Sequence, residues 1–213
     1  TDADFSASAS AKSETEITIA VQNTNSGIDN IDGYEIDIKN AVGNYVYKGE
    51  VSGKNGGSYT VTGLTPCQLY YFKVYAIGTN GSKSLVSKDV TATTKVKSGA
   101  NGTKVTLNSV TATTAKQIDV AWTPINVSSV KGYDVYYCTT SACNCTDKIW
   151  VAGADASTKS ISVNAGTTYY VKVVVVGTDD ERGADSNIKS ATTPFNNDIF
   201  VTNINVTNIQ ETT

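Results

Sequence analysis

The sequence predicts an all-β protein in which two antiparallel β-sandwiches follow one another and a single extended strand ends the chain. Three observations lead to this prediction. The chain repeats itself once, and apolar and polar residues alternate with a period of two inside each copy. No window has the roughly 3.6-residue periodicity of an amphipathic helix.

The internal repeat fixes the domain organisation. Three pairs of segments share an offset of 99 residues: GYEIDIK from Gly33 with GYDVYYC from Gly132, LYYFKVYAIGT from Leu69 with TYYVKVVVVGT from Thr168, and VTATTK from Val90 with KSATTP from Lys189. Upstream, EITIAV and QIDVAW match at an offset of 101, so the copies differ by two residues in one loop. We therefore expect one domain over residues 1–96, a second over 97–195 and a tail over 196–213.

Strands are expected wherever residues alternate between core-facing and solvent-facing types, as in residues 17–21, 34–38 and 72–76 of the first copy. Clusters of Gly, Asn, Asp and Ser separate these runs, at residues 23–32, 53–57 and 80–84. The run from Val173 to Val176 is apolar throughout and predicts a buried strand. About seven short strands per copy indicate an antiparallel sandwich.

One segment of each copy resembles a known family. LTPCQLYYFKV, from Leu64, resembles the E–F corner of a fibronectin type III domain, whose pattern is Leu-x-Pro-Gly-Thr-x-Tyr-x-Val-x-Val. The second copy has VNAGTTYYVKV, from Val163. The resemblance extends over about residues 4–194 and implies a tandem pair of immunoglobulin-like sandwiches. This module serves adhesion, spacing and scaffolding alike, so the resemblance indicates fold more than function.

The resemblance also implies roles for single residues. Tyr70 and Tyr169 would be the tyrosine-corner residues, each with its phenol bonded back to the backbone. Trp122 takes the strand-B position at which the family usually has a buried tryptophan. The first copy has Val21 there and must fill that volume in another way.

The composition excludes several classes of protein. The chain has 17 Lys and Arg against 20 Asp and Glu, which argues against a nucleic-acid partner. No apolar run approaches the roughly 20 residues that a membrane span needs. No signal peptide opens the chain, so Thr1 is expected to be either a processed terminus or a boundary of the expressed segment.

Five Asn-x-Ser/Thr sequons suggest a glycosylated extracellular or cell-surface protein: Asn80, Asn101, Asn126, Asn144 and Asn205. An Asn- and Thr-rich chain also produces sequons by chance, and we expect this of one or two of the five. Asn144 lies between two cysteines, which makes it a weaker candidate than Asn80 or Asn126. N-linked glycans are thus expected, and no cofactor.

Three cysteines lie within eight residues, Cys138, Cys143 and Cys145, and the fourth, Cys67, is far upstream. Zinc would need paired Cys or His ligands, and the chain has no histidine. Disulfides agree better with an oxidising compartment. We expect Cys138 to pair with either Cys143 or Cys145 across a hairpin, with Cys143 and Cys145 opening the next strand.

Cys67 stands where the second copy has Gly166, a residue that tolerates positive φ. If the domains are stacked end to end, Cys67 lies about a domain length from the cysteine cluster. A bond between them would need a sharp bend or a neighbouring molecule. Two alternatives stay open, an intermolecular disulfide and a buried unpaired thiol.

The tail resembles the first strand of a third copy. Val201-Thr202 and Val206-Thr207 match Val105-Thr106 and Val110-Thr111 at an offset of 96. A lone strand exposing Ile199, Val201, Ile204 and Val206 is not stable in water. The first copy opens with residues 5–11, whose inward positions after Phe5 are only alanines. An underfilled edge and a spare apolar strand suggest donor-strand exchange into a head-to-tail filament. The alternative is a longer multi-repeat protein that has been cut.

An enzyme is the least supported class, because the chain lacks histidine for acid–base chemistry. Asp179, Asp180, Glu181 and Asp185 cluster in one loop, but their spacing matches no calcium loop. We expect a non-enzymatic extracellular structural or adhesive protein, with itself as partner and an unspecified cell-surface or carbohydrate ligand. The alternative is a ligand-binding or spacer fragment of a larger surface protein or secreted enzyme.

Overall fold

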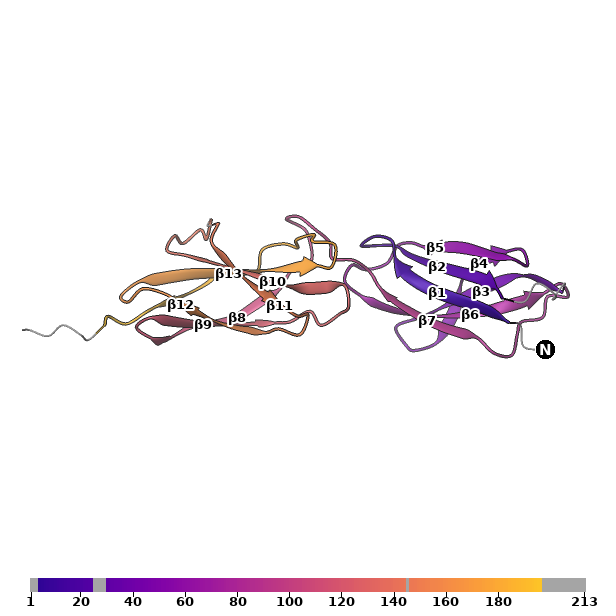
Figure 1. Cartoon of the computed structure of the whole chain (residues 1–213), viewed down its shortest axis with the longest axis horizontal. Helices are drawn as coiled ribbons and strands as arrows, with labels where there is room; N and C mark the ends of the chain where they lie inside the picture. Colours follow the sequence, from indigo (N-terminus) through magenta and orange to yellow (C-terminus); the bar gives the residue numbers. More distant parts are fainter. Residues whose placement is uncertain (1–3, 25–29, 145, 197–213) are drawn as a thin grey trace, which may run out of the picture.

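The structure is a computed structural model that describes residues 4–24, 30–144 and 146–196. Two β-sandwiches lie end to end and give an elongated molecule (Figure 1). Regular structure in the described part of the chain is entirely β-strand, without a helix. The predicted all-β pair of sandwiches is confirmed, and residues 197–213 of the predicted terminal strand lie outside the described residues.

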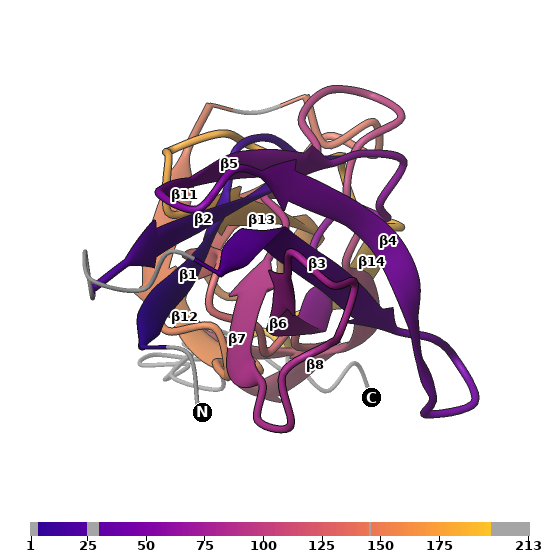
Figure 2. The same ribbon diagram turned by 90° about the vertical axis from the view of Figure 1, so that its right-hand side faces the viewer.

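The first sandwich, here called the first module, has seven strands. They are β1 (Phe5–Ala11), β2 (Ile17–Asn23), β3 (Ile31–Lys39), β4 (Tyr45–Ser52), β5 (Gly56–Val61), β6 (Leu69–Gly78) and β7 (Lys88–Thr93). One sheet has the order β1-β2-β5 and the other β4-β3-β6-β7. Figure 2, seen along the long axis, shows these two sheets with the second module behind them.

The second module repeats this plan. Its strands are β8 (Thr106–Thr114), β9 (Gln117–Thr123), β10 (Val130–Cys138), β11 (Lys148–Ala152), β12 (Thr158–Ser162), β13 (Thr168–Gly177) and β14 (Lys189–Thr192). The sheets are β8-β9-β12 and β11-β10-β13-β14. The strand order matches that of the first module position by position, as the repeat predicts.

The alternation in the sequence correctly predicts which residues of β2 face the core. Ile17, Ile19 and Val21 of β2 are buried, whereas Thr18 and Ala20 between them face outward. In β13 the run from Val173 to Val176 is buried throughout, as predicted. Each module encloses its own apolar cluster between its two sheets.

The two cores fill the tryptophan position differently. In the second module Trp122 packs against Tyr133, with ring centroids 5.4 Å apart. In the first module Tyr34 occupies the place of Tyr133, and its aromatic partner is Phe5 from β1, at 5.2 Å. A ring from the neighbouring strand thus supplies the volume that Val21 leaves, since an aromatic side chain can bury about 150–250 Å².

Candidate functional site

One residue of the linker between the modules, Val96, lies in the core of the second module. Val96 belongs to the apolar cluster of the second module and is only 3% exposed. Its side chain lies on Gly177, where an added Cβ would stand 3.2 Å from the Val96 Cβ. A larger residue at position 177 would force Val96 to shift by a few tenths of an ångström and would also crowd Asp179 Oδ1, 2.6 Å from the added Cβ. The linker therefore acts as part of the second module.

Hydrogen bonds and one ion pair tie the same junction. Ser128 donates its hydroxyl hydrogen to Thr93 Oγ1 over 2.9 Å. Lys95 Nζ lies 3.6 Å from Asp179 Oδ2. Further along, the Ala184 amide donates to the Thr103 carbonyl over 2.9 Å. The Ser128–Thr93 and Lys95–Asp179 contacts thus join the end of the first module to the second module.

Cys67 lies in this junction. Its backbone is left-handed, with φ of 56°, as the glycine in the corresponding turn predicts. Its Sγ is 3.9 Å from Ser129 Oγ of the second module, and the side chain packs against the second core. Burial raises the pKa of the Cys67 thiol, while the contact with Ser129 opposes that shift. This position favours a buried unpaired thiol, because an intermolecular disulfide would require the junction to open.

Cys138 and Cys143 lie at the far end of the second module. Cys138 ends β10, and Cys67 sits beside Ser129, just before the start of that strand. Cys143 is buried, with φ of 49° and its Sγ 3.5 Å from the Tyr170 carbonyl. The next strand begins only at Lys148, so Cys143 belongs to the loop and does not open a strand. Cys145 falls outside the described residues, and the disulfide pairing stays a prediction.

Both corner tyrosines make the backbone contact that the resemblance implies. The Thr65 amide donates to the Tyr70 hydroxyl over 2.8 Å. The Asn164 amide donates to the Tyr169 hydroxyl over 3.0 Å. Each bond bridges the turn that precedes the longest strand of its module.

The structure places four of the five sequon asparagines on the surface: Asn80, Asn101, Asn126 and Asn144 are exposed. Asn80 lies in the turn after β6, where its Oδ1 accepts a hydrogen bond from the Ser82 amide over 3.0 Å. Asn205 lies outside the described residues, as do Ile199, Val201, Ile204 and Val206 of the proposed joining strand.

Carboxylates in the acidic loop face lysines one at a time. Asp179 pairs with Lys95, Asp180 with Lys131 and Asp185 with Lys172. The hydrogen bond from Lys131 is the main cause that lowers the pKa of Asp180. Within the described part of the chain, no three His, Cys, Asp or Glu side chains gather as metal ligands.

Two features of the junction and the sheets escaped the sequence analysis. The first is Val96, whose only signal is a single valine in the polar linker TTKVKSGANGT. The second is Asp134, which is 2% exposed and accepts from Lys148 at 2.7 Å and Arg182 at 2.8 Å. Glu35 and Lys83 pair at the corresponding positions of the first module, so aligning the copies would have found this contact.

The free edge of the first module carries a shallow groove of about 490 Å³. Phe5 and Ala7 of β1 line one side of it, and residues 87–90 of β7 and the turn before it line the other. Strands β1 and β7 are the edge strands of their sheets. The groove thus lies between two strand edges whose backbone amides and carbonyls are not paired with another of the described strands of their sheet.

These features define a protein of tandem antiparallel β-sandwiches joined by a buried linker. The model of the fibronectin type III domain family matches residues 5–93, which is the first module, and confirms there the resemblance read from the sequence. Two solved chicken structures are similar to this chain. The FN1–FN3 domains of CNTN1 have 18% identity and a TM-score of 0.41, with 91% of this chain and 67% of that chain covered. The two-domain fibronectin type III segment of tenascin has 19% identity and a TM-score of 0.40, with 87% and 95% covered.

None of the curated protein sequences compared with this chain matches it. Fibronectin type III domains are typically extracellular or cell-surface modules without catalytic activity, and they often mediate protein interactions. Nowhere in the described residues is there a helix that could cross a membrane.

Proposed function

We propose that this chain is a non-enzymatic structural subunit, a stiff two-module rod of an extracellular filament or adhesive surface fibre. The observation that carries the proposal is the burial of Val96 in the second core. A flexible spacer would keep its whole linker in water, whereas Val96 of this linker is packed like a core residue. A rod that resists bending transmits force and holds a fixed spacing.

The side-chain chemistry supports a structural role over catalysis. The chain contains no histidine, and three carboxylates of its acidic loop, those of Asp179, Asp180 and Asp185, are paired with separate lysines. No cofactor is required by this role. The exposed sequons Asn80, Asn101, Asn126 and Asn144 support a glycan coat, which suits a protein outside the cell.

The subunits would be joined head to tail by the C-terminal strand, residues 196–213. Its apolar side chains Ile199, Val201, Ile204 and Val206 need a surface to cover them. The groove between β1 and β7 offers apolar side chains, and the adjoining strand edges offer open backbone groups. Adding a strand there would follow the general mode of β-strand addition.

Two measurements test this function. Small-angle scattering of the chain should give one extended shape with a fixed maximum dimension, and replacing Val96 by Ser should broaden it. A broad distribution for the unmodified chain would contradict the rod.

Electron microscopy of concentrated protein should show filaments, and the double variant Val201→Lys/Val206→Lys should abolish them. Gln210→Lys adds a charge at a polar position of the tail and serves as control. Monomers under all conditions would favour the alternative, a spacer or ligand-binding segment of a larger surface protein.

A further inference from the structure

Phe195 is the counterpart of Val96 in the second module, 99 residues later. The chain leaves both modules in the same way. The Cys67 amide donates to the Lys95 carbonyl over 3.1 Å, and the Gly166 amide donates to the Pro194 carbonyl over 3.0 Å. Val96 then enters the next core, whereas the Phe195 ring leans on Gly166 and stays 79% exposed.

The end of the second module that receives Val96 has the same backbone hydrogen bonds as the equivalent end of the first module. In the second module, the Gly177 amide donates to the Glu181 carbonyl over 2.8 Å, and the Thr178 amide donates to the Ser129 carbonyl over 2.9 Å. The residues 99 positions earlier repeat both bonds, with Gly78 donating to Ser82 and Thr79 to Asn30, each over 2.9 Å. The two receiving ends therefore share one backbone.

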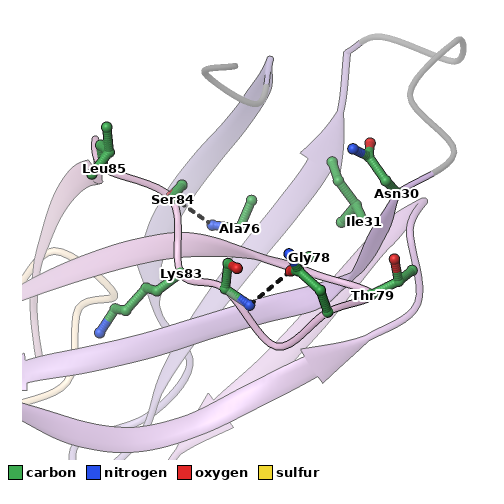
Figure 3. A pocket seen from close by; sticks show the side chains of 10 residues that line it. Asn30, Ile31, Ala76, Gly78, Thr79, Lys83, Ser84 and Leu85 are labelled. Carbon is green, nitrogen blue, oxygen red and sulfur yellow. Dashed lines mark hydrogen bonds between the residues drawn. The ribbon is translucent and has the colours of Figure 1, made fainter.

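In the first module this receiving end is a pocket of about 370 Å³ (Figure 3). Ile31, Ala76 and Gly78 line it, with Leu85 at its rim. Leu85 is 97% exposed. Its counterpart Ala184 is only 6% exposed, because the linker lies over it and accepts its amide hydrogen bond. Among the described residues, the first module thus presents the same surface without a linker over it.

The side chains at the two receiving ends differ in size. The pocket of the first module has Ala76 where the second module has the larger Val175, but it has Ile31 and Leu85 where the second module has the smaller Val130 and Ala184. The exposed residue is Phe195 where the first module ends in Val96, so the inserting side chain is larger.

We propose that Phe195 of one chain inserts into the pocket at Gly78 of a second copy, so that the junction between subunits repeats the junction between modules. The inference deepens the proposed filament and rests on it, because it names a second surface, besides the groove between β1 and β7, at which one copy meets the next. Such a contact joins two different patches, and it produces a linear polymer when the rotation between successive copies does not close a ring.

Phe195 would meet the apolar side chains of the pocket, Ile31, Ala76 and Leu85, which lie among polar ones. The ion pair of the internal junction has no counterpart at this contact. Pro194 stands where the internal junction has Lys95, and Asn80 stands where it has Asp179. Association should therefore depend little on salt. Between about 0.05 M and about 1 M NaCl we expect the dissociation constant to change less than threefold, since no pair of charges is there to be screened.

The test uses sedimentation velocity of the full chain over a concentration series, with electron microscopy of the same samples. Phe195→Asp removes the inserting side chain, and Leu85→Asp charges the pocket rim. Both residues are exposed, so neither change disturbs folding. Val42→Asp, at a position that is 80% exposed and lines no pocket, is the matched control. Each of the two test variants should weaken association by roughly 30-fold or more, as expected for a central apolar anchor.

Mixing the two variants gives the decisive result. The intact Phe195 of the Leu85→Asp chain meets the intact pocket of the Phe195→Asp chain, while the other two ends repel. The mixture should therefore form 1:1 dimers, and no assembly larger than a dimer should appear. If the mixture stays monomeric, the head-to-tail insertion is wrong.

Two further outcomes would overturn the inference in different ways. Polymerisation of Phe195→Asp like the unmodified chain would refute the insertion and leave the strand-joined filament standing. An unmodified chain that stays monomeric to about 1 mM would refute both, because that concentration corresponds to only about 4 kcal/mol of binding free energy.

Discussion

Val96 Cγ2 lies 3.3 Å from the point that a Cβ on Gly177 would occupy. A residue of the linker and a residue at the end of β13 are thus in van der Waals contact, with no side chain between them. This contact makes the second module dependent on the last residues of the first. It is the structural reason to treat the two sandwiches as one rod.

Replacing Val96 by Ala should lower the free energy of unfolding of the second module by about 2 kcal/mol, because two buried methyl groups are lost and a cavity remains. Chemical denaturation that follows the Trp122 fluorescence measures this. Val42→Ala, at an exposed position, should change stability by less than about 0.5 kcal/mol. Equal effects of the two substitutions would show that Val96 is not packed in the core.

Cys67 should react slowly with thiol reagents in the folded chain. Its pKa is raised by burial, so less of the reactive thiolate is present at pH 8 than for a free cysteine. The rate should still be rising with pH where that of an unperturbed thiol has levelled off. Rates over a pH series, in the chain and in Cys67→Ser, identify the contribution of this thiol.

Opening the junction should reverse this protection. Val96→Ser is expected to speed the reaction of Cys67 and to bring its pH profile back toward that of a free cysteine. An unchanged rate in Val96→Ser would mean that the Cys67 thiol is already accessible.

Asp134→Asn should destabilise the second module by about 3 kcal/mol. It removes a buried carboxylate that accepts from Lys148 and Arg182, and both cations lose their partner. The matched control is Asp185→Asn, whose ion pair with Lys172 is exposed on the carboxylate side and should contribute less than about 1 kcal/mol. Denaturant titrations of both variants measure the difference, and a similar small loss in each would contradict this assignment.

Phe5→Ala should destabilise the first module by about 3–4 kcal/mol, because Phe5 supplies the aromatic ring beside Tyr34. Ser6→Ala changes the outward-facing neighbour and should be nearly neutral. Thermal unfolding followed through the tyrosine signal compares them. A small effect of Phe5→Ala would mean that the N-terminal strand does not support this core.

A glycan on Asn80 should prevent subunit docking, because Asn80 lines the pocket that receives Phe195. Mass spectrometry of glycosylated material should find Asn80 unoccupied in filaments and occupied in the monomer fraction. Asn126 is exposed and lines no pocket on the first module, so its occupancy should be the same in both fractions. Filaments with fully occupied Asn80 would exclude this docking site.

The sequence by itself determined the repeat, the strand periodicity and the sandwich fold, because these depend on local patterns of alternation and turn residues. It also identified Cys67 as an unusual occupant of a glycine position, since the second copy has Gly166 there. The prediction from the sequence that Cys143 opens a strand was wrong. In the structure Cys143 is a buried loop residue, and the strand begins at Lys148.

Only the tertiary structure decided what the linker does. Val96 and Phe195 occupy equivalent positions in the sequence, yet Val96 is buried by the second core, whereas Phe195 is exposed among the described residues. The proposed contact between Phe195 and the pocket at Gly78 of another copy likewise pairs residues more than a hundred positions apart in the sequence. Local periodicity in the sequence does not predict such contacts. They depend on which residues cover each module end, and two ends with the same backbone can differ in this respect.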